Sequence, residues 1–274
     1  MKRNYSVIIS FSGIAPIPIK GLRLLLLLIA VCFAGVPVRG QFSLGMSGGL
    51  NIPSALLSAD GTFSAGGNYL PSQMMPDELH YNSGNYFFNI AFFSFMELNY
   101  RSTLLHFRQS PPLKEKYVWN KDRSVGIRFR ILTEGKTWRP ALSIGSNDVV
   151  TTGKITKLTD DSGGNRYFAS VYGVATRTFR FQAQQLRLTA GYYIPFYKRS
   201  DRNGPFAGAE WIPARCCWLS ILGEYDCKAV NLGVQATLFR HLTVQVFCYD
   251  FRAVSAGIRY SLNLLGKGAS CNGY

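Results

Sequence analysis

Apolar and polar residues alternate with a period of two along much of the chain beyond residue 60. The alternation is clearest in five segments, 95–101, 124–131, 185–194, 230–238 and 254–264. In 254–264, apolar residues occupy the even positions, and Ser255, Gly257 and Arg259 occupy odd ones. Successive side chains of a strand point to opposite faces. The pattern therefore predicts strands with one apolar and one polar face.

Weaker segments of the same kind fill the gaps between these five. They lie near 61–69, 84–93, 138–147, 166–176, 205–212, 217–226 and 241–250. Together the segments make about twelve strands, most of them about ten residues long. Turn-forming pairs such as Asp60-Gly61 and Asn203-Gly204 separate neighbouring segments. No helical period competes over a useful length beyond residue 40, so the sequence predicts an all-β fold.

Two architectures use such strands. A soluble sandwich buries one face of each sheet and exposes the other to water. A transmembrane antiparallel β-barrel turns one face to lipid and the other to a polar lumen. About ten residues is the length that a tilted strand needs to cross a bilayer. Aromatic residues gather near segment ends, as in interfacial girdles, although an ordinary core would also contain them. These residues are Phe92, Phe93, Phe95, Trp138, Tyr192, Trp211, Trp218 and Tyr249. We therefore expect the barrel.

The first forty residues carry basic residues and no acid. An uncharged run from Leu24 to Val38 follows Arg23, and small residues follow near Gly40. This arrangement predicts a cleaved signal peptide with cleavage near Gly40/Gln41, because an uncleaved anchor would need a longer span without Pro37. Lipidation of Cys32 is a further alternative. The expected organisation is a signal peptide (1–40), an N-terminal turn segment (41–60), a barrel (61–264) and a C-terminal tail (265–274).

The connections between the predicted strands differ in length. Short turns lie at 202–205, 213–216, 227–229 and 239–241, and longer polar loops lie at 68–84, 108–122 and 148–165. Short turns of outer-membrane barrels face the periplasm and long loops face outward. We therefore expect the four short turns at one end of the barrel and the three loops at the other. Loop 148–165, which begins at Asp148, is expected to be mobile and exposed.

Composition excludes several classes of protein. Hydrophobic residues make up 47% and aromatic residues 14%, which argues against disorder. The net charge is +15, but no basic helix or nucleic-acid module carries it, so we expect no nucleic-acid partner. Six cysteines include no C-x-x-C pair, so a zinc site is not expected. Cys227 and Cys248 either pair or pack within strands. No cofactor motif is present, and we expect no cofactor and no metal.

Charged residues on the polar faces are the most informative chemistry. They fall opposite the lipid-facing positions and are the lumen-facing candidates: Glu97, Arg128, Arg130, Arg187, Glu210, Glu224 and Arg259. One interpretation is a salt-bridged interior that closes the barrel. The other is a lumen lined by guanidinium groups that attracts acidic sugars, because arginine pairs bidentately with carboxylates. The sequence leaves both open.

Catalytic signatures are weak. No G-x-S-x-G motif, Walker loop or H-E-x-x-H motif occurs. Ser102 and His106 fall on one face of a strand by alternation, and histidine can act as a base to serine in ester hydrolysis. Nothing in their spacing singles them out. We expect no catalytic residues, with an outer-membrane lipid hydrolase as the alternative.

Several stretches resemble the YjbH family of outer-membrane proteins, which is tied to exopolysaccharide production and export. The opening 48–55, Gly-Gly-Leu-Asn-Ile-Pro-Ser-Ala, carries the resemblance first, followed by Asp60-Gly61-Thr62-Phe63. Further similar stretches lie at 122–126, 140–145, 206–211 and 223–226. The resemblance implies an outer-membrane barrel of a Gram-negative bacterium and implies no catalytic residues. The chain departs from the family in length, because many members are longer. It also departs at its C-terminus, where a tail follows the last predicted strand.

The expected function is therefore non-enzymatic support of the assembly or export of surface polysaccharide. The expected partners are outer-membrane lipid and, by resemblance, an acidic polysaccharide and polysaccharide export proteins. Besides the lipid hydrolase, a second alternative is a structural or adhesion barrel that binds through loop 148–165.

Overall fold

The structure, a computed structural model, describes residues 43–76, 81–108, 117–151, 154–155, 166–198, 200–214 and 216–265. Several sequence predictions lie outside these residues. They are the signal peptide with Cys32, the tail beyond residue 265, the side chain of His106 and most of loop 148–165. No helix in the described ranges is long and apolar enough to span a bilayer.

Strands dominate the described residues. They are β1 (Thr62–Leu70), β2 (Ser83–Phe92), β3 (Met96–Arg108), β4 (Tyr117–Leu132), β5 (Ala141–Thr151), β6 (Lys154–Ile155), β7 (Ser170–Phe181), β8 (Gln184–Pro195), β9 (Gly204–Ile212), β10 (Leu219–Tyr225), β11 (Val230–Leu238), β12 (Leu242–Tyr249) and β13 (Ala253–Asn263). A short 3-10 turn, η1 (Ser72–Met74), follows β1.

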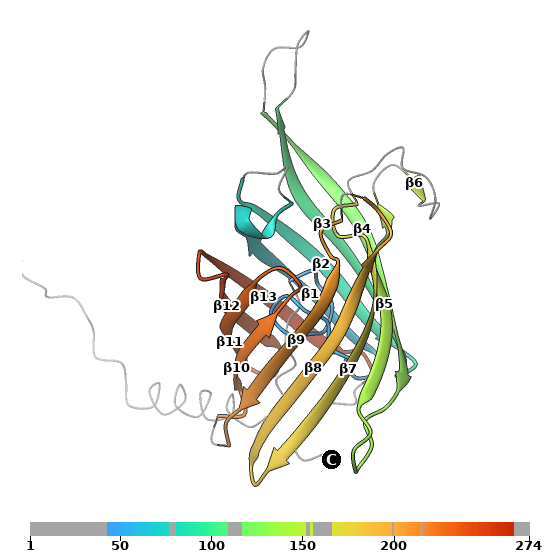
Figure 1. Cartoon of the computed structure of the whole chain (residues 1–274), viewed down its shortest axis with the longest axis vertical. Coiled ribbons are helices and arrows are strands. Elements are labelled where there is room, and N and C mark those ends of the chain that lie inside the picture. The colour runs from blue at the N-terminus through green and yellow to red at the C-terminus, as the bar shows by residue number, and fades with distance from the viewer. Residues whose placement is uncertain are drawn as a thin grey trace, which may run out of the picture. The chain divides into compact units, whose positions relative to one another are not determined.

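The sheet closes on itself. Each strand pairs antiparallel with the next, β5 pairs with β7, and β13 returns to pair with β1. The short β6 pairs only with β5, so the ring contains the other twelve strands. Figure 1 shows these strands tilted around a common interior. The predicted all-β antiparallel barrel of about twelve strands is confirmed.

Alternation continues around the ring with apolar side chains outside. On β11, the exterior Val234 is 45% exposed, whereas the next residue, Gln235, is fully buried. On β13, Ile258 is exposed and Arg259 is buried. A water-soluble protein buries apolar side chains, and exposed apolar patches of this extent mark a membrane or partner surface. The exterior is therefore suited to hydrocarbon and the interior to polar groups.

Aromatic side chains mark both ends of the apolar exterior. Exposed aromatics near the end where β1 begins and β13 ends, the terminal end, are Phe93, Phe95, Trp138, Phe181, Trp211 and Phe239. Those near the opposite end, the loop end, are Tyr69, Tyr86, Tyr192, Tyr225 and Phe251. Two such belts match the interfacial girdles of membrane barrels. The prediction that Tyr249 belongs to these belts is wrong. β12 continues its alternation and points this residue inward, where it is 6% exposed.

The prediction that the four short turns share one end is wrong. Turns of an antiparallel ring must alternate between its two ends. The turns at 213–218 and 239–241 lie at the terminal end, but those at 196–203 and 226–229 lie at the loop end with the long connection 71–82. Turn length alone did not reveal this order.

Two predicted loops are partly strand. β3 extends to Arg108 and β4 begins at Tyr117, so both ends of the predicted loop 108–122 continue the sheet. Asp148 was expected in an exposed loop. It lies instead in β5, 1% exposed, and its carboxylate is 2.5 Å from the guanidinium of Arg101. That expectation is wrong for Asp148 because a buried partner on β3 retains it in the sheet.

The lipid-facing exterior predicts a position-dependent cost for charge. Val234 lies in the middle of β11, and Val230 begins the same strand. Val234→Arg should lower the free energy of unfolding in lipid vesicles by about 2–4 kcal/mol, and Val230→Arg by about 0–1 kcal/mol, because the cost falls toward the interface. Denaturant unfolding of the two variants measures the difference. Equal and small losses would contradict a bilayer around β11.

Candidate functional site

The interior of the barrel contains a segment of the chain itself. Residues 43–58, here the plug segment, precede β1 and contact inward-facing side chains of strands on all sides of the ring. Most of its apolar side chains are buried: Leu44, Met46, Leu50, Ile52, Ala55 and Leu57. In Figure 1 the segment is the blue coil among the strands. The sequence predicted a turn segment here and did not predict its place in the lumen.

Backbone hydrogen bonds fold the plug segment into a compact hairpin. The amide of Ser43 donates to the carbonyl of Leu50 at 2.9 Å, and that of Gly49 donates to Ile52 at 2.9 Å. Gly48 and Pro53 form an isolated antiparallel bridge. Gly45 has a φ of +95°, and a Cβ there would lie 2.7 Å from the Cβ of Phe87. Glycine is therefore required where the segment meets the wall.

A buried ion pair forms the first anchor of the plug segment. Glu97 on β3 and Arg128 on β4 are cross-strand neighbours, they pair directly, and both side chains are fully buried. Glu97 accepts hydrogen bonds from the amide (3.2 Å) and hydroxyl (2.7 Å) of Ser47. Arg128 donates to the carbonyls of Ser47 (2.6 Å) and Ser54 (2.5 Å). The pair thus holds both passes of the plug segment.

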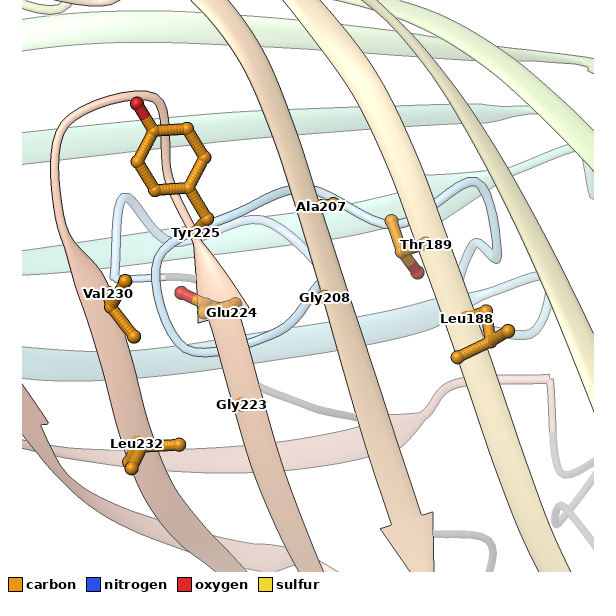
Figure 2. Close-up of a pocket in the computed structure, with 9 residues that line it drawn as sticks. All are labelled: Leu188, Thr189, Ala207, Gly208, Gly223, Glu224, Tyr225, Val230 and Leu232. Carbon is orange, nitrogen blue, oxygen red and sulfur yellow. The ribbon is translucent and has the colours of Figure 1, made fainter.

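A carboxylate on the opposite wall forms the second anchor. Glu224 on β10 accepts from the amides of Leu50 (2.8 Å) and Asn51 (2.5 Å). The Asn51 side chain donates to Asp226 and accepts from Arg202 at 2.9 Å. Figure 2 shows Glu224 on the inner side of the β10 ribbon, toward the plug segment, with Tyr225 on the outer side. The tip of the plug segment is therefore fixed through its backbone and one amide side chain.

Neutral side chains bind the remaining backbone groups. Asn68 (3.0 Å) and Asn85 (2.9 Å) both donate to the carbonyl of Ser43. Ala55 is held on both sides: its amide donates to the hydroxyl of Thr176, and its carbonyl accepts from Ser143, each at 2.9 Å. Buried backbone groups need such partners. The wall supplies them to a segment that pairs with no strand in the described part of the chain.

Glycines in the wall make room for the apolar side chains of the plug segment. A Cβ on Gly126 would lie 2.5 Å from the terminal methyl of Met46. A Cβ on Gly208 would lie 2.8 Å from the Cδ1 of Ile52 and 3.0 Å from the Cβ of Glu224. These close approaches leave no space for a larger residue without movement. The wall and the plug segment are complementary in shape as well as in polarity.

Charged groups at the loop end complete the site outside the spanning strands. Arg202 is 5% exposed, and its guanidinium lies 5.7 Å from the ring centre of Tyr193. Burial opposes its charge, but Tyr193 and Asp226 outweigh burial, so the pKa of Arg202 lies above its ordinary value. Burial raises the pKa of the nearby Cys227 thiol. The four described cysteines, including Cys227 and Cys248, are free, so these two do not pair.

The seven lumen-facing candidates separate into two groups. Glu97, Arg128 and Glu224 bind the plug segment directly. The others lie elsewhere on the inner face: Arg187 pairs with Glu210 at 2.9 Å, Arg130 donates to the carbonyl of Ser94 in the β2–β3 turn, and Arg259 is 5% exposed on β13. The arrangement contains both of the features that the sequence left open, an ion-paired interior and a wall with guanidinium groups.

Sequence reasoning missed several residues of this site. Asn51 and Arg202 were not singled out, and neither was the pair Arg101–Asp148. Asp226 follows the candidate Glu224 at the period of two, but its role in binding Asn51 depends on the position of the plug segment. No pattern in the sequence signalled that position. The described residues include no group of three or more side chains arranged to bind a metal.

The predicted hydrolase pair gains no support from the described residues. Ser102 on β3 is fully buried opposite Tyr86 of β2. The side chain of His106 lies outside the described residues, so the pair stays a prediction.

A hollow of about 480 Å³ opens across β8 to β11. The small residues Ala207 and Gly223 lie at its centre, and Leu188, Tyr225 and Leu232 border it (Figure 2). Alternation places all five on the outer face, where side chains meet the apolar exterior. The inward-facing Gly208 and Glu224 also line the hollow, so it opens on the exterior beside the wall that holds the tip of the plug segment.

Because the plug segment occupies the lumen, we expect a barrel that does not conduct ions. Neither the wild type nor Arg187→Ala should conduct in a planar lipid bilayer, because the plug segment fills the interior and its anchors do not include Arg187. Single-channel recording at moderate voltage is the measurement. Steady conductance of the wild type would contradict a closed interior, and conductance of Arg187→Ala alone would mean that the Arg187–Glu210 pair closes it.

Comparison with known proteins identifies one family. The family model described as YjbH, exopolysaccharide biosynthesis protein YbjH, matches residues 40–210. No curated protein has a sequence that matches the chain. Among solved structures, outer membrane phospholipase A from Escherichia coli is similar with a TM-score of 0.32 and 10% identity, over 82% of this chain and 97% of that chain.

Proposed function

The chain belongs to the YjbH family of exopolysaccharide biosynthesis proteins, and we propose that it supports the assembly or export of exopolysaccharide from the outer membrane without catalysing a chemical step. The observation that carries this proposal is the closed barrel with an apolar exterior and a polar interior. Such a barrel belongs in a bilayer, and transmembrane barrels of this type occur in outer membranes.

Orientation in the membrane follows from the connections. The loop end has the longest connections, 71–82 and the one between β5 and β7, and the terminal end has shorter turns such as 93–95 and 182–183. Outer-membrane barrels turn short connections to the periplasm. In the proposed orientation the terminal end faces the periplasm, where export proteins would meet it, and the loop end faces the cell surface.

The inner wall suggests the class of polysaccharide. Arg187 and Arg259 lie on the inner face. Guanidinium groups pair bidentately with carboxylates, and hydroxyl groups of sugars hydrogen-bond to amides and hydroxyls like those of Gln235 and Thr237 on β11. We therefore expect an acidic polysaccharide to be the partner, together with outer-membrane lipid around the exterior.

Deleting the gene and measuring surface exopolysaccharide tests the proposal. The deletion strain should lose exopolysaccharide, and the wild-type gene supplied in trans should restore it. Unchanged exopolysaccharide would overturn the proposed function. Gel mobility of membrane fractions with and without boiling tests the location separately, because a closed barrel in the outer membrane migrates differently when it is not heated. A chain found only in the periplasm or medium would contradict the proposed location.

A further inference from the structure

Contacts between the wall and the plug segment have the chemistry of peptide recognition. Glu97 and Glu224 accept from three backbone amides of the plug segment. Four of its carbonyls accept from asparagine and arginine side chains of the wall, namely Asn68, Asn85, Asn99 and Arg128. These contacts are hydrogen bonds to backbone groups of the segment, and bound peptides are likewise held through their main chain. The lumen therefore holds the plug segment as a binding site holds a ligand.

The ring does not depend on the plug segment for its own hydrogen bonds. All the described strands of the ring pair with two neighbours. Within the described residues, the backbone–backbone bonds of 43–58 are internal, as in Ser43 to Leu50 and Ser54 to Ser47. The segment reaches the wall through wall side chains. Its departure would break those side-chain contacts and leave the ladder of the barrel intact.

The inner wall carries polar and charged groups that water could hydrate if the plug segment left the lumen. The wall groups that the segment covers include two carboxylates and a guanidinium, all buried at present: Glu97, Glu224 and Arg128. Burial of charge is costly, and hydration of an emptied lumen would remove that cost. The apolar side chains of Met46 and Ile52 oppose departure because they pack against Gly126 and Gly208. The structure thus contains opposing contributions to a closed and an open state.

We infer that the lumen is a peptide-binding site whose resident ligand is the chain's own segment 43–58, and that this segment is a displaceable gate. The closed state is the one described. In the open state the segment leaves its anchors at Glu97, Arg128 and Glu224, and the polar wall lines a water-filled passage. The inference deepens the proposed function, since a gate gives the barrel a route for export, but the closing experiment uses the purified barrel alone.

The first test weakens the ligand and leaves the wall unchanged. Met46→Ser with Ile52→Ser in the full-length protein removes apolar contacts of the plug segment. In planar bilayers this variant should show discrete conductance that the wild type lacks. A synthetic peptide with the sequence of residues 43–58 should suppress the conductance, and a scrambled peptide of the same composition should not. A folded variant, shown by its heat-dependent gel mobility, that stays silent would overturn the gate. Conductance insensitive to the peptide would overturn the binding site.

A second measurement keeps the plug segment nearly native, in case the double variant fails to fold. Ser47→Cys is introduced into full-length protein whose native cysteines are replaced by serine, and a membrane-impermeant maleimide is added to the folded barrel in vesicles. A gate predicts slow labelling that the peptide of residues 43–58 accelerates. Labelling only at the rate of global unfolding, unchanged by the peptide, would overturn the inference. Both measurements use the purified barrel, whereas the proposed function is tested by the exopolysaccharide of the deletion strain. A negative result for the gate therefore leaves the proposed function untouched.

Discussion

Arg128→Met should lower the free energy of unfolding by about 3–5 kcal/mol. The Arg128 and Glu97 side chains are fully buried and paired. Removing the guanidinium leaves the carboxylate of Glu97 buried without its counter-charge. It also removes the donor for the carbonyls of Ser47 and Ser54. Denaturant unfolding in lipid vesicles measures the loss.

A double variant separates the ion pair from the other contacts. Glu97→Gln combined with Arg128→Met removes both charges, so it should lose less than the sum of the two single variants. Arg187→Ala is the matched control on the same face, because the Arg187 side chain remains 12% exposed in its pair with Glu210. A loss below about 1 kcal/mol for Arg128→Met would be the value of an exposed pair, and would contradict the buried position of Arg128.

Glu224→Ala should release the tip of the plug segment and lower the free energy of unfolding by about 2–6 kcal/mol. The estimate counts two buried amides, those of Leu50 and Asn51, that lose their acceptor at about 1–3 kcal/mol each. Limited proteolysis of the folded protein should then cleave near Asn51, where the wild type resists. The free energy of unfolding and the cleavage site are both measured.

Glu224→Gln is the matched control. Glutamine keeps one acceptor oxygen at nearly the same place, so the loss should be smaller and cleavage near Asn51 slower than in Glu224→Ala. Equal behaviour of the two variants would mean that the carboxylate does not hold the plug segment through its oxygens. Full stability of both variants would contradict the contacts of Leu50 and Asn51 with Glu224.

Strands were predictable from the sequence because each of their two faces meets a different medium. Lipid outside and polar groups inside impose a period of two, and that period is visible in segments such as 230–238 and 254–264. The prediction failed where this constraint ends. In the continuation of β4 toward Tyr117, apolar and polar residues form separate runs, Tyr-Val-Trp at 117–119 and Asn-Lys-Asp-Arg at 120–123. They do not alternate, so the sequence suggested a loop.

The plug segment was not predictable because its position depends on the closed ring. Gly48, Gly49 and Pro53 are turn residues, and they indicate a connection when they are considered locally. Leu50 and Ile52 are buried only because strands from the rest of the chain surround them. The amides of Leu50 and Asn51 donate to Glu224, which lies more than 170 residues away in the sequence. No local pattern contains such information.

Interior aromatics illustrate the same limit. Phe206 lies on the inner face of β9 and is 1% exposed, although the inner faces were expected to be polar. A Cβ on Gly191 would lie 2.2 Å from the ring of Phe206, so the glycine across the strands provides the space that the ring fills. The pairing of a large residue with a glycine on the neighbouring strand depends on register, which alternation does not fix.

Cross-linking of the plug segment to the wall tests the central claim most directly. Ala55→Cys with Ser143→Cys, in protein whose native cysteines are replaced by serine, should be joined in isolated outer membranes by a short reagent that links two thiols, because the Ser143 hydroxyl lies 2.9 Å from the carbonyl oxygen of Ala55 and the two residues are therefore neighbours. Ala55→Cys with Leu142→Cys should not, because Leu142 lies on the outer face, 38% exposed. A cross-link at 143 and none at 142 is the predicted result. No cross-link at 143, or equal cross-linking at both positions, would contradict a barrel that holds residues 43–58 in its lumen.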